Sequence, residues 1–324
     1  MKWYPSVPLE TLRSWDRKFN DVVFAVGNFD GVHRGHRALL EAARAKADEL
    51  GCRAGVLTFA PHPRRYFAGP DKPPFLLTRG VEQRVELLEG TGLVDVMVEL
   101  AFNTELSSVE AEDFALGILG THLGTRHVLA GPDFRFGHKR GGDMLQLDRW
   151  GQDMSFGVSA VPLRHDDAEG GVISSSRVRQ ALMDADITTA NRLLGRPWSA
   201  EGTVEQGDQI GRTLGFPTAN LSWPKLQLRP HFGVYAGWAA VNGGERLPAV
   251  SYLGTRPTVD GVEERFEVHL LEWSGDIYGQ HVRFWFDSFI HPDLEFRGLE
   301  ALKVQIAEDC EEARRRLGVA QPTT

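Results

Sequence analysis

The sequence predicts two domains, a parallel-stranded α/β domain followed by a small antiparallel β-barrel with a C-terminal helix. Three observations support this fold class. The apolar run Val22–Val26 and the run Arg53–Phe59 enclose a helix-forming segment, which gives a strand-helix-strand unit with a right-handed crossover. From Ala200 onward, short strand-like runs alternate with glycine-rich turns. Residues 299–317 carry apolar side chains at helical spacing.

The composition is that of a globular protein. At 324 residues the chain is long enough for two domains, and we expect domains 1–185 and 186–324. No apolar run reaches the roughly 20 residues of a membrane span, and Met1–Pro8 lacks the apolar block of a signal peptide. The formal net charge of −8 argues against a nucleic-acid partner. We therefore expect a cytoplasmic protein without membrane contact, whose oligomeric state stays open.

The two cysteines do not indicate a metal site or a disulfide framework. Cys52 and Cys310 lie far apart in the sequence, both in expected core elements, and no Cys-x-x-Cys pair occurs. Because the protein is acidic overall, anionic substrates must be held by local basic groups.

The segment Gly27–His36 is a glycine-rich loop between a buried strand and a helix. The helix-forming residues begin at Arg37 and end before Gly51, which occupies a C-cap position. The N-terminus of such a helix favours an anion. His33 and His36 project to the same side there, so both imidazoles can donate to one phosphate chain. A zinc pair and a purely structural pair are the alternatives, and zinc lacks further ligands nearby.

Further strands and helices continue the first domain. Strands are expected at 94–100 and 126–130, and helices at 80–89 and 108–119, the last one starting with cap-type Ser108. The loop 131–143 is rich in glycine and is expected to be flexible. Its basic side chains could close over phosphates or form a solvated surface; they are Arg135, Lys139 and Arg140.

The run Val172–Leu182 places serines and arginines at a helix start. One serine is explained as an N-cap. Arg177 and Arg179 lie where the helix dipole repels cations, so a bound anion would account for them. Ser176 and Arg179 share a face, which makes Arg179 the better candidate for a triphosphate contact. A short helix is expected at 186–194.

The barrel contains a second glycine-rich stretch, Gly207–Leu221. Its glycines allow a backbone cradle for phosphates, and Thr218 and Asn220 offer oxygen ligands for Mg²⁺. An ordinary turn is the alternative, because no Walker-type Gly-Lys-Ser/Thr occurs. In the strand 265–271, Glu267 shares a face with His269. In the last helix, a packing stripe is expected at Leu299, Leu302, Ile306, Cys310 and Leu317.

Several of these stretches resemble one family. The run Gly27-Asn-Phe-Asp-Gly-Val-His-Arg-Gly-His36 is similar to the His-x-Gly-His signature of nucleotidyltransferases, and Gly211-Arg-Thr-Leu-Gly-Phe-Pro-Thr-Ala-Asn220 to the riboflavin kinase signature. Gly131–Gly137 and Ile173–Arg179 resemble further elements of an adenylylation site. The likeness to prokaryotic bifunctional riboflavin kinases/FAD synthetases extends through nearly the whole chain.

This resemblance implies a Rossmann-like nucleotidyltransferase domain followed by a riboflavin kinase barrel. It implies ATP, riboflavin and FMN as substrates, Mg²⁺ as cofactor, and FMN and then FAD as products. It makes Glu267 the general base of the kinase, with Gly211, Gly215, Thr218 and Asn220 on ATP and metal. The adenylyltransferase residues that it implies are Gly27, Asn28, Phe29, Asp30, His33, His36, Asp133, Ser175, Ser176 and Arg179.

Four positions depart from the family pattern: Ala60 replaces an Asp, Ser176 a Thr, Val259 a Phe, and His291 an Arg. Two other functions stay open at this stage. A cytidylyl- or pantetheine-phosphate adenylyltransferase would use only the His-x-Gly-His half. A flavin-binding regulator without turnover is supported only by Ala60 and His291.

Overall fold

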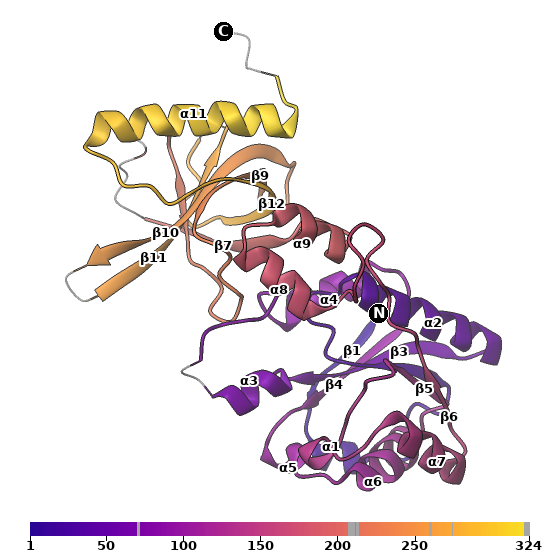
Figure 1. The fold of residues 1–324 in the computed structure, drawn as a ribbon. Coiled ribbons are helices and arrows are strands. Elements are labelled where there is room, and N and C mark those ends of the chain that lie inside the picture. Colours follow the sequence, from indigo (N-terminus) through magenta and orange to yellow (C-terminus); the bar gives the residue numbers. More distant parts are fainter. Residues whose placement is uncertain (70–71, 207–210, 212–213, 259–260, 274, 321–324) are drawn as a thin grey trace. The chain divides into compact units, whose positions relative to one another are not determined.

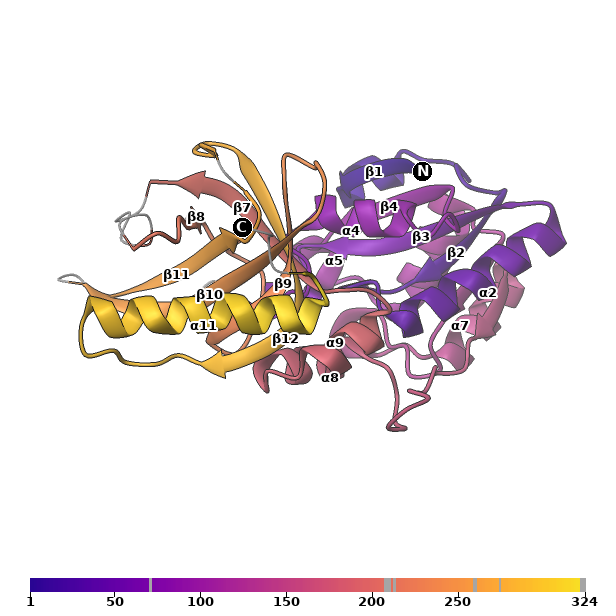
Figure 2. The same ribbon diagram turned by 90° about the horizontal axis from the view of Figure 1, so that it is seen from above.

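The computed structural model describes residues 1–69, 72–206, 211, 214–258, 261–273 and 275–320. The chain divides into two compact units, Met1–Pro73 with Val81–Ile173, and Pro74–Gly80 with Ser174–Thr324. Each unit has its own sheet (Figures 1 and 2). The boundary expected between residues 185 and 186 remains a prediction.

The first unit has a parallel six-stranded sheet in the order β1-β4-β3-β2-β5-β6, which confirms the predicted fold class. From β2 the chain proceeds to β3 and β4 on one side and later to β5 and β6 on the other. The carboxyl ends of β2 and β5 therefore flank the point where open α/β sheets bind ligands. The strands are β1 (Lys2–Val7), β2 (Val22–Val26), β3 (Arg53–Ala60), β4 (Val96–Ala101), β5 (His127–Ala130) and β6 (Gly157–Ala160).

Helices cover both faces of this sheet. Val23 and Ala25 of β2 pack with α2 and α4, while Phe24 and Val26 pack with α1, η1 and α7. This alternation is that of a strand buried on both sides. The helices are α1 (Leu9–Arg13), α2 (Arg34–Leu50), α3 (Pro63–Ala68), α4 (Val81–Glu89), α5 (Thr104–Ser107), α6 (Ala111–Asp113), the π-helix η1 (Phe114–Leu123), the 3₁₀ turn η2 (His138–Arg140) and α7 (Met144–Met154).

A helix is present where residues 108–119 were expected to form one, but it begins at Ala111 and runs as α6 into η1, so only the predicted start at Ser108 is wrong. Asn103, not Ser108, starts the first helix here, because its side chain accepts the Leu106 N–H at 2.9 Å. Ser108 instead ends α5, and the chain continues through α6 into η1. Sequence reasoning also missed β1, β6, α3 and α7, of which β1 and β6 are short edge strands. Cys52 lies only partly buried in the turn after α2, not in a core element.

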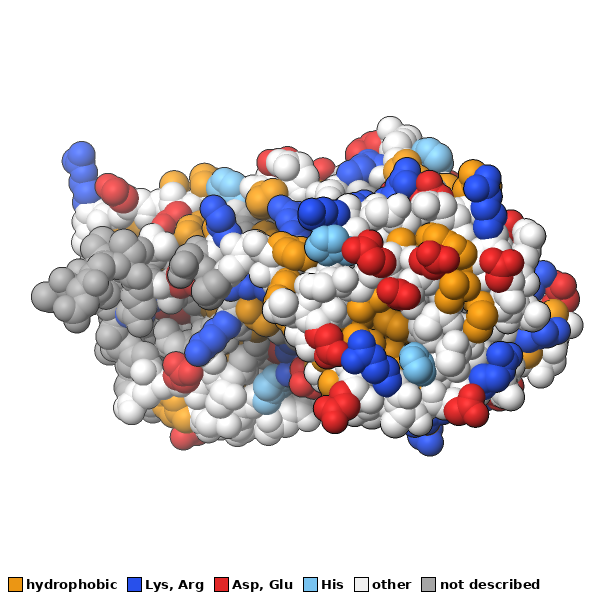
Figure 3. Space-filling model, turned by 90° about the horizontal axis from the view of Figure 1, so that it is seen from below, with side chains coloured by type: hydrophobic (Ala, Val, Ile, Leu, Met, Phe, Trp, Pro, Cys, Tyr) orange, Lys and Arg blue, Asp and Glu red, His pale blue; other side chains and the backbone are white. Residues whose placement is uncertain are grey.

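A hollow of about 480 Å³ lies beside α1, α5 and η1, on the face opposite α2 and α4. Its rim carries Glu105, Glu110 and Asp113 together with Arg13, which pairs with Glu105 at 2.7 Å, while Leu9 and Ile118 contribute apolar surface. On the side viewed in Figure 3, acidic side chains lie beside apolar ones. With three carboxylates and one arginine the rim is net acidic, which disfavours a phosphate there.

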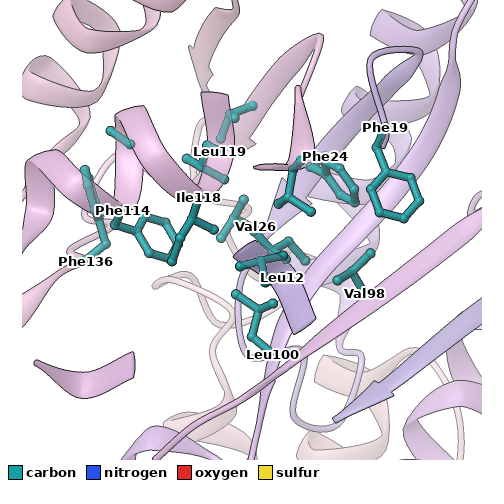
Figure 4. Close-up of a cluster of buried hydrophobic side chains, with 14 of the residues drawn as sticks. Leu12, Phe19, Phe24, Val26, Val98, Leu100, Phe114, Ile118, Leu119 and Phe136 are labelled. Carbon is teal, nitrogen blue, oxygen red and sulfur yellow. The ribbon is translucent and has the colours of Figure 1, made fainter. Parts of the chain in front are cut away.

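The basic loop after β5 is anchored, not flexible as expected. Phe136 is 6% exposed and packs near Phe114 in the core, at a ring-centroid distance of 5.5 Å (Figure 4). The backbones of Phe136 and Gly142 pair in both directions, and the His138 N–H donates to the Val109 carbonyl at 2.7 Å. Burial of the Phe136 side chain stabilises one conformation of this loop, although its glycines would allow many.

The second unit contains a closed antiparallel barrel in the order β10-β11-β8-β7-β12-β9, as predicted. Helices α8 and α9 precede it, and α11 packs against β9 and β10 (Figure 2). The elements are α8 (Ser175–Met183), α9 (Ile187–Leu194), β7 (Ser199–Glu205), β8 (Ala219–Leu221), β9 (Gly233–Val241), β10 (Leu247–Thr258), β11 (Gly261–Leu270), β12 (His281–Pro292) and α11 (Leu299–Leu317).

The stripe expected on α11 is correct for most of its length. Cys310 is buried, and Ile306 and Leu317 pack against the same cluster. Burial raises the pKa of the Cys310 thiol to about 12, so this cysteine stays protonated. Leu299 does not belong to the stripe, because it is the first residue of the helix and is 56% exposed.

The segment Pro74–Gly80 belongs to the second unit although it lies between α3 and α4 in the sequence. Leu76 pairs with the chain around Gln227, through hydrogen bonds of 3.1 and 2.8 Å to the backbone of Leu226 and Leu228. The Leu77 carbonyl accepts from the indole N–H of buried Trp198 at 2.8 Å. No sequence pattern indicated that this segment belongs to the second unit.

Candidate active sites

The loop from Gly27 to His33 turns the chain from β2 into α2. Phe29, Gly31 and Val32 have φ values of 50°, 83° and 41°, so three residues adopt left-handed backbone within this loop. Such conformations are found where surrounding structure holds the backbone for a function. The helix begins at Arg34, three residues before the expected start, because His33 is its N-cap.

His33 and His36 lie together as predicted. Their rings stack with centroids 3.7 Å apart and planes inclined by 14°. His33 Nδ1 accepts the backbone N–H of His36 at 3.1 Å, so the proton of a neutral His33 ring is on Nε2. Phe29 supports the pair, with its ring centroid 5.1 Å from that of His36. Two imidazoles at a helix N-terminus are suited to bind phosphate oxygens.

Other predicted residues follow neighbouring strands at the same edge of the sheet. Asp133 comes after β5, and its carboxylate lies 2.9 Å from where a side chain on Gly131 would begin. β3 ends at Ala60, which precedes Pro61, and His62 caps α3 by accepting the Arg64 N–H at 3.0 Å. Asp30 is buried, at 2% exposure. The parallel sheet therefore brings these loops to one edge.

In the run Val172–Leu182, which is rich in serine and arginine, one serine caps a helix. Ser174 is the N-cap of α8 and accepts the Arg177 N–H at 3.3 Å, while Ser175 and Ser176 are the first helical residues. Arg179 is 8% exposed, and its Nε donates to the Phe75 carbonyl at 2.7 Å. These residues belong to the second unit, so their place in an ATP site with His33 and His36 stays a prediction.

In the barrel, Glu267 lies opposite Asn220 in the pairing of β11 with β8. Its Oε2 accepts the Thr218 hydroxyl at 3.3 Å, and Arg265 Nη1 lies 3.4 Å from Oε1. The Glu267 side chain is 23% exposed, so it is neither sealed in the core nor on an open surface. The structure thus brings together three of the predicted kinase residues.

Two pockets meet at Thr218. The first, of about 370 Å³, also contains Glu267, and its apolar walls are Val234, Val250, Leu294, Phe296, Leu302 and Ile306. The second, of about 580 Å³, lies on the other side of Thr218 and is lined by Pro217, Asn220, Trp273, Asp276 and Tyr278 among others. The carboxylate of Glu267 therefore lies beside the junction of an apolar and a more polar pocket.

Glycines shape the chain at this junction. A side chain on Gly211 would begin 2.5 Å from the Phe216 carbonyl and 3.1 Å from Thr218 Oγ1, so glycine is required there. Gly215 has a φ of 90°, a conformation that glycine adopts without strain. The departing position Val259 lies outside the described residues.

Sequence reasoning missed part of the first pocket. Tyr252 lies opposite Glu267 in the pairing of β10 with β11, and its hydroxyl donates to Asp293 at 3.0 Å. Burial is the main cause that raises the Tyr252 pKa, with Asp293 adding to it. The departing residue His291 lines the same pocket and contacts Asp309 Oδ1 through Nε2 at 2.9 Å. The signal that could have found this pocket was the apolar stripe of α11, which supplies one wall.

His269 lies on the same face of β11 as Glu267 and contacts the loop that precedes β8. Its Nδ1–H donates to the Pro217 carbonyl at 2.8 Å. Burial lowers the pKa of the His269 imidazole below its ordinary value, so this ring is neutral near pH 7. In the part of the chain that the structure describes, no three or more His, Cys, Asp or Glu residues form a metal-binding group.

Comparison with known proteins decides the family. A family model described as FAD synthetase matches residues 16–177, and one described as riboflavin kinase matches residues 194–317. The bifunctional riboflavin kinase/FMN adenylyltransferase of Escherichia coli (strain K12) is 40% identical over 301 residues, covering 93% of this chain and 94% of that protein. The chain belongs to the bifunctional riboflavin kinase/FMN adenylyltransferase family. The resemblance inferred from sequence is confirmed.

Other relatives agree over similar lengths. The bifunctional riboflavin kinase/FMN adenylyltransferase of Bacillus subtilis (strain 168) is 34% identical over 299 residues, covering 90% of this chain and 92% of that protein. A crystal structure from Streptococcus pneumoniae, described as a macrolide-efflux protein, is 29% identical with a TM-score of 0.83, covering 96% of this chain and 99% of that one. Among the residues described for this family member, no helix is long and apolar enough to span a bilayer.

Proposed function

We propose that the barrel phosphorylates riboflavin to FMN at the junction of its two pockets, and that the loop after β2 serves the adenylylation of FMN to FAD. The junction at Thr218, with Glu267 beside it, is the observation that carries the proposal. The apolar pocket suits the flavin ring system, and the more polar pocket suits ATP. The ribityl hydroxyl of riboflavin and the γ-phosphate of ATP would then meet next to the carboxylate of Glu267.

In the kinase step, Glu267 is the general base. The ribityl hydroxyl gives its proton to the carboxylate as its oxygen attacks the γ-phosphorus of ATP. The bond from that phosphorus to the bridging oxygen breaks, and ADP leaves with the electron pair. The Thr218 hydroxyl and Arg265 hold the two carboxylate oxygens of Glu267 in place. This orientation keeps the base within reach of the attacking hydroxyl.

Thr218 and Asn220 would hold Mg²⁺ in this site. Their side chains offer oxygen donors, the ligands that Mg²⁺ takes, and Asn220 is in register with Glu267. When bound, Mg²⁺ supplies positive charge to the phosphates of ATP.

In the adenylylation step, no general base is required, because the phosphate of FMN is already anionic at neutral pH. A phosphate oxygen of FMN attacks the α-phosphorus of ATP, the α–β bond breaks, and pyrophosphate leaves. His33 and His36 orient and stabilise the triphosphate through hydrogen bonds at the helix N-terminus. Ser175, Ser176, Arg179 and Asp133 are predicted further contributors.

The deciding experiment is chromatography of products after incubating the purified chain with riboflavin, ATP and Mg²⁺. FMN appearing first and FAD second supports both activities. FMN alone would call for a second incubation with FMN in both redox states, and neither product would favour a flavin-binding regulator. Replacing FMN with pantetheine phosphate, or ATP with CTP, tests the other nucleotidyltransferase activities.

A further inference from the structure

Arg84 and Glu99 form a buried ion pair in the first unit. Arg84 Nη2 donates to Glu99 Oε2 at 2.6 Å, and the two side chains are 8% and 2% exposed. Glu99 lies within β4, and the other residues of this strand are apolar. A carboxylate in the middle of a buried parallel strand is unusual, so this pair calls for a reason beyond packing.

The pair reaches the loop that carries the histidines. Arg84 Nη1 donates to the carbonyl oxygen of Asn28 at 3.2 Å, and the Thr58 hydroxyl donates to the same oxygen at 3.3 Å. Thr58 and Glu99 are adjacent residues in the pairing of β3 with β4. Two buried side chains from different elements therefore fix one carbonyl oxygen at the end of β2.

The fixed carbonyl directly precedes Phe29. Phe29 is fully buried with a φ of 50°, and its ring lies against His36. Rotation of the peptide between Asn28 and Phe29 would move that ring and, with it, the surface against which the His36 imidazole rests. The bonds to the Asn28 carbonyl oppose this rotation.

Stability alone does not account for the pair. Replacing a buried ion pair by apolar side chains of similar volume is often neutral or stabilising. Apolar residues could fill this space, but they could not donate to the Asn28 carbonyl. Glu99 also accepts the backbone N–H of Ser6 at 3.3 Å, which holds the carboxylate in position beneath Arg84.

We propose that Arg84, neutralised by Glu99, is a positioning residue for adenylyl transfer: it fixes the Asn28 carbonyl and thereby the orientation of the His36 imidazole. This inference rests on the proposed function of the loop after β2. It extends that site to α4 and β4, which supply no group to the substrate.

The test compares FAD formation in the wild type and in the double variant Arg84→Met/Glu99→Leu, using the full chain with FMN, ATP and Mg²⁺. The double variant removes both buried charges and the bond to Asn28 while keeping similar volume. We expect kcat for FAD formation to fall at least tenfold, with KM for FMN changed less than threefold. Riboflavin phosphorylation by the same preparation should stay within twofold of the wild type, because its residues lie in the other unit.

Arg44→Met is the matched control. Arg44 also joins a carboxylate, Asp95, to a backbone carbonyl, that of Cys52, but at the opposite end of the sheet. It should change kcat for FAD formation less than twofold. The ¹⁵N resonances of the His36 ring, followed by NMR, should shift in the double variant and not in Arg44→Met. This second measurement does not depend on turnover.

Thr58→Val keeps the inference testable where the double variant does not fold. It removes only the second donor to Asn28, and we expect a threefold to tenfold fall in kcat with the His36 resonances shifted. Wild-type kcat and unshifted His36 resonances in a folded variant of either kind would overturn the inference. If the wild type made no FAD, or if His36→Ala made it normally, the proposed function would fail instead.

Discussion

Thr218 and Glu267 are joined by a hydrogen bond of 3.3 Å from the Thr218 hydroxyl to Glu267 Oε2, at the point where the two pockets of the barrel meet. The threonine is the last residue before β8 and the glutamate lies in β11, so the antiparallel pairing of these strands creates the contact. A carboxylate held in this way can accept a proton without first reorganising.

Replacing Glu267 by Gln keeps the hydrogen bond to Thr218 but removes the base. We expect riboflavin phosphorylation to fall by a factor of about 10²–10⁴, the usual contribution of a positioned general base. FAD formation from added FMN should be unchanged, as measured by chromatography of products. Glu264→Gln is the control, because Glu264 lies on the same strand but faces Arg229 at 2.8 Å. Full kinase activity in Glu267→Gln would rule out its role as base.

Replacing His36 by Ala removes one of the two stacked imidazoles. We expect FAD formation from FMN to fall by a factor of about 10²–10³, the cost of losing one preorganised donor to developing charge. FMN formation from riboflavin should continue at the wild-type rate in the same tube. His122→Ala serves as control, because its ring contacts the Trp15 carbonyl on the opposite face of the sheet. Equal loss of both activities in a folded His36→Ala protein would contradict the two-site assignment.

Stability should decrease as the pH falls below about 6.5, in part through His269. Burial lowers the pKa of this imidazole in the folded chain below its ordinary value of 6.5. The unfolded chain therefore takes up the proton first, and the free energy of unfolding rises with pH between the folded pKa and 6.5. Thermal unfolding of the wild type and of His269→Gln, followed from pH 5 to pH 8, measures this. The variant should lose less stability in acid; identical pH dependence would exclude His269 as a contributor.

The contact between His291 and Asp309 should stabilise the kinase unit. Asp309 is 6% exposed, and its Oδ1 accepts from both His291 Nε2 and Gln305 Nε2 at 2.9 Å. His291→Ala leaves a buried carboxylate with one partner fewer, which we expect to cost about 1–3 kcal/mol. Denaturant unfolding of His291→Ala, Asp309→Asn and the double variant gives the coupling energy. Strictly additive effects would show that the contact contributes nothing.

The overall architecture could be predicted from the sequence because its signals are local. The buried run Val22–Val26, the helix after it with Gly51 as its C-cap, and the glycine-separated strands of the barrel each follow from periodicity and turn residues. His33 and His36 could be paired in advance because three-residue spacing at a helix start fixes their direction. Thr218, Asn220 and Glu267 could be placed in one site only through the resemblance to riboflavin kinases, and the pairing of β8 with β11 brings them together.

The rest depends on contacts between segments far apart in the sequence. The edge strands β1 and β6 are short, and β6 is only partly buried, so neither has a strong periodic signal. The loop with Phe136 looks free by composition, but one aromatic side chain anchors it in the core. Arg84 appears as an ordinary charged residue of a surface helix, and only the fold shows Glu99 behind it. Patterns in the local sequence do not indicate such contacts between distant segments.

The place of the segment Pro74–Gly80 in the second unit limits how the chain can be cut into two proteins. Because this segment belongs to the second unit while the chain on both sides of it belongs to the first, no single break in the backbone separates the two units. A break near the expected boundary would leave the barrel without the carbonyl that the Trp198 indole uses. A barrel produced without residues 74–80 would therefore lack part of its own unit.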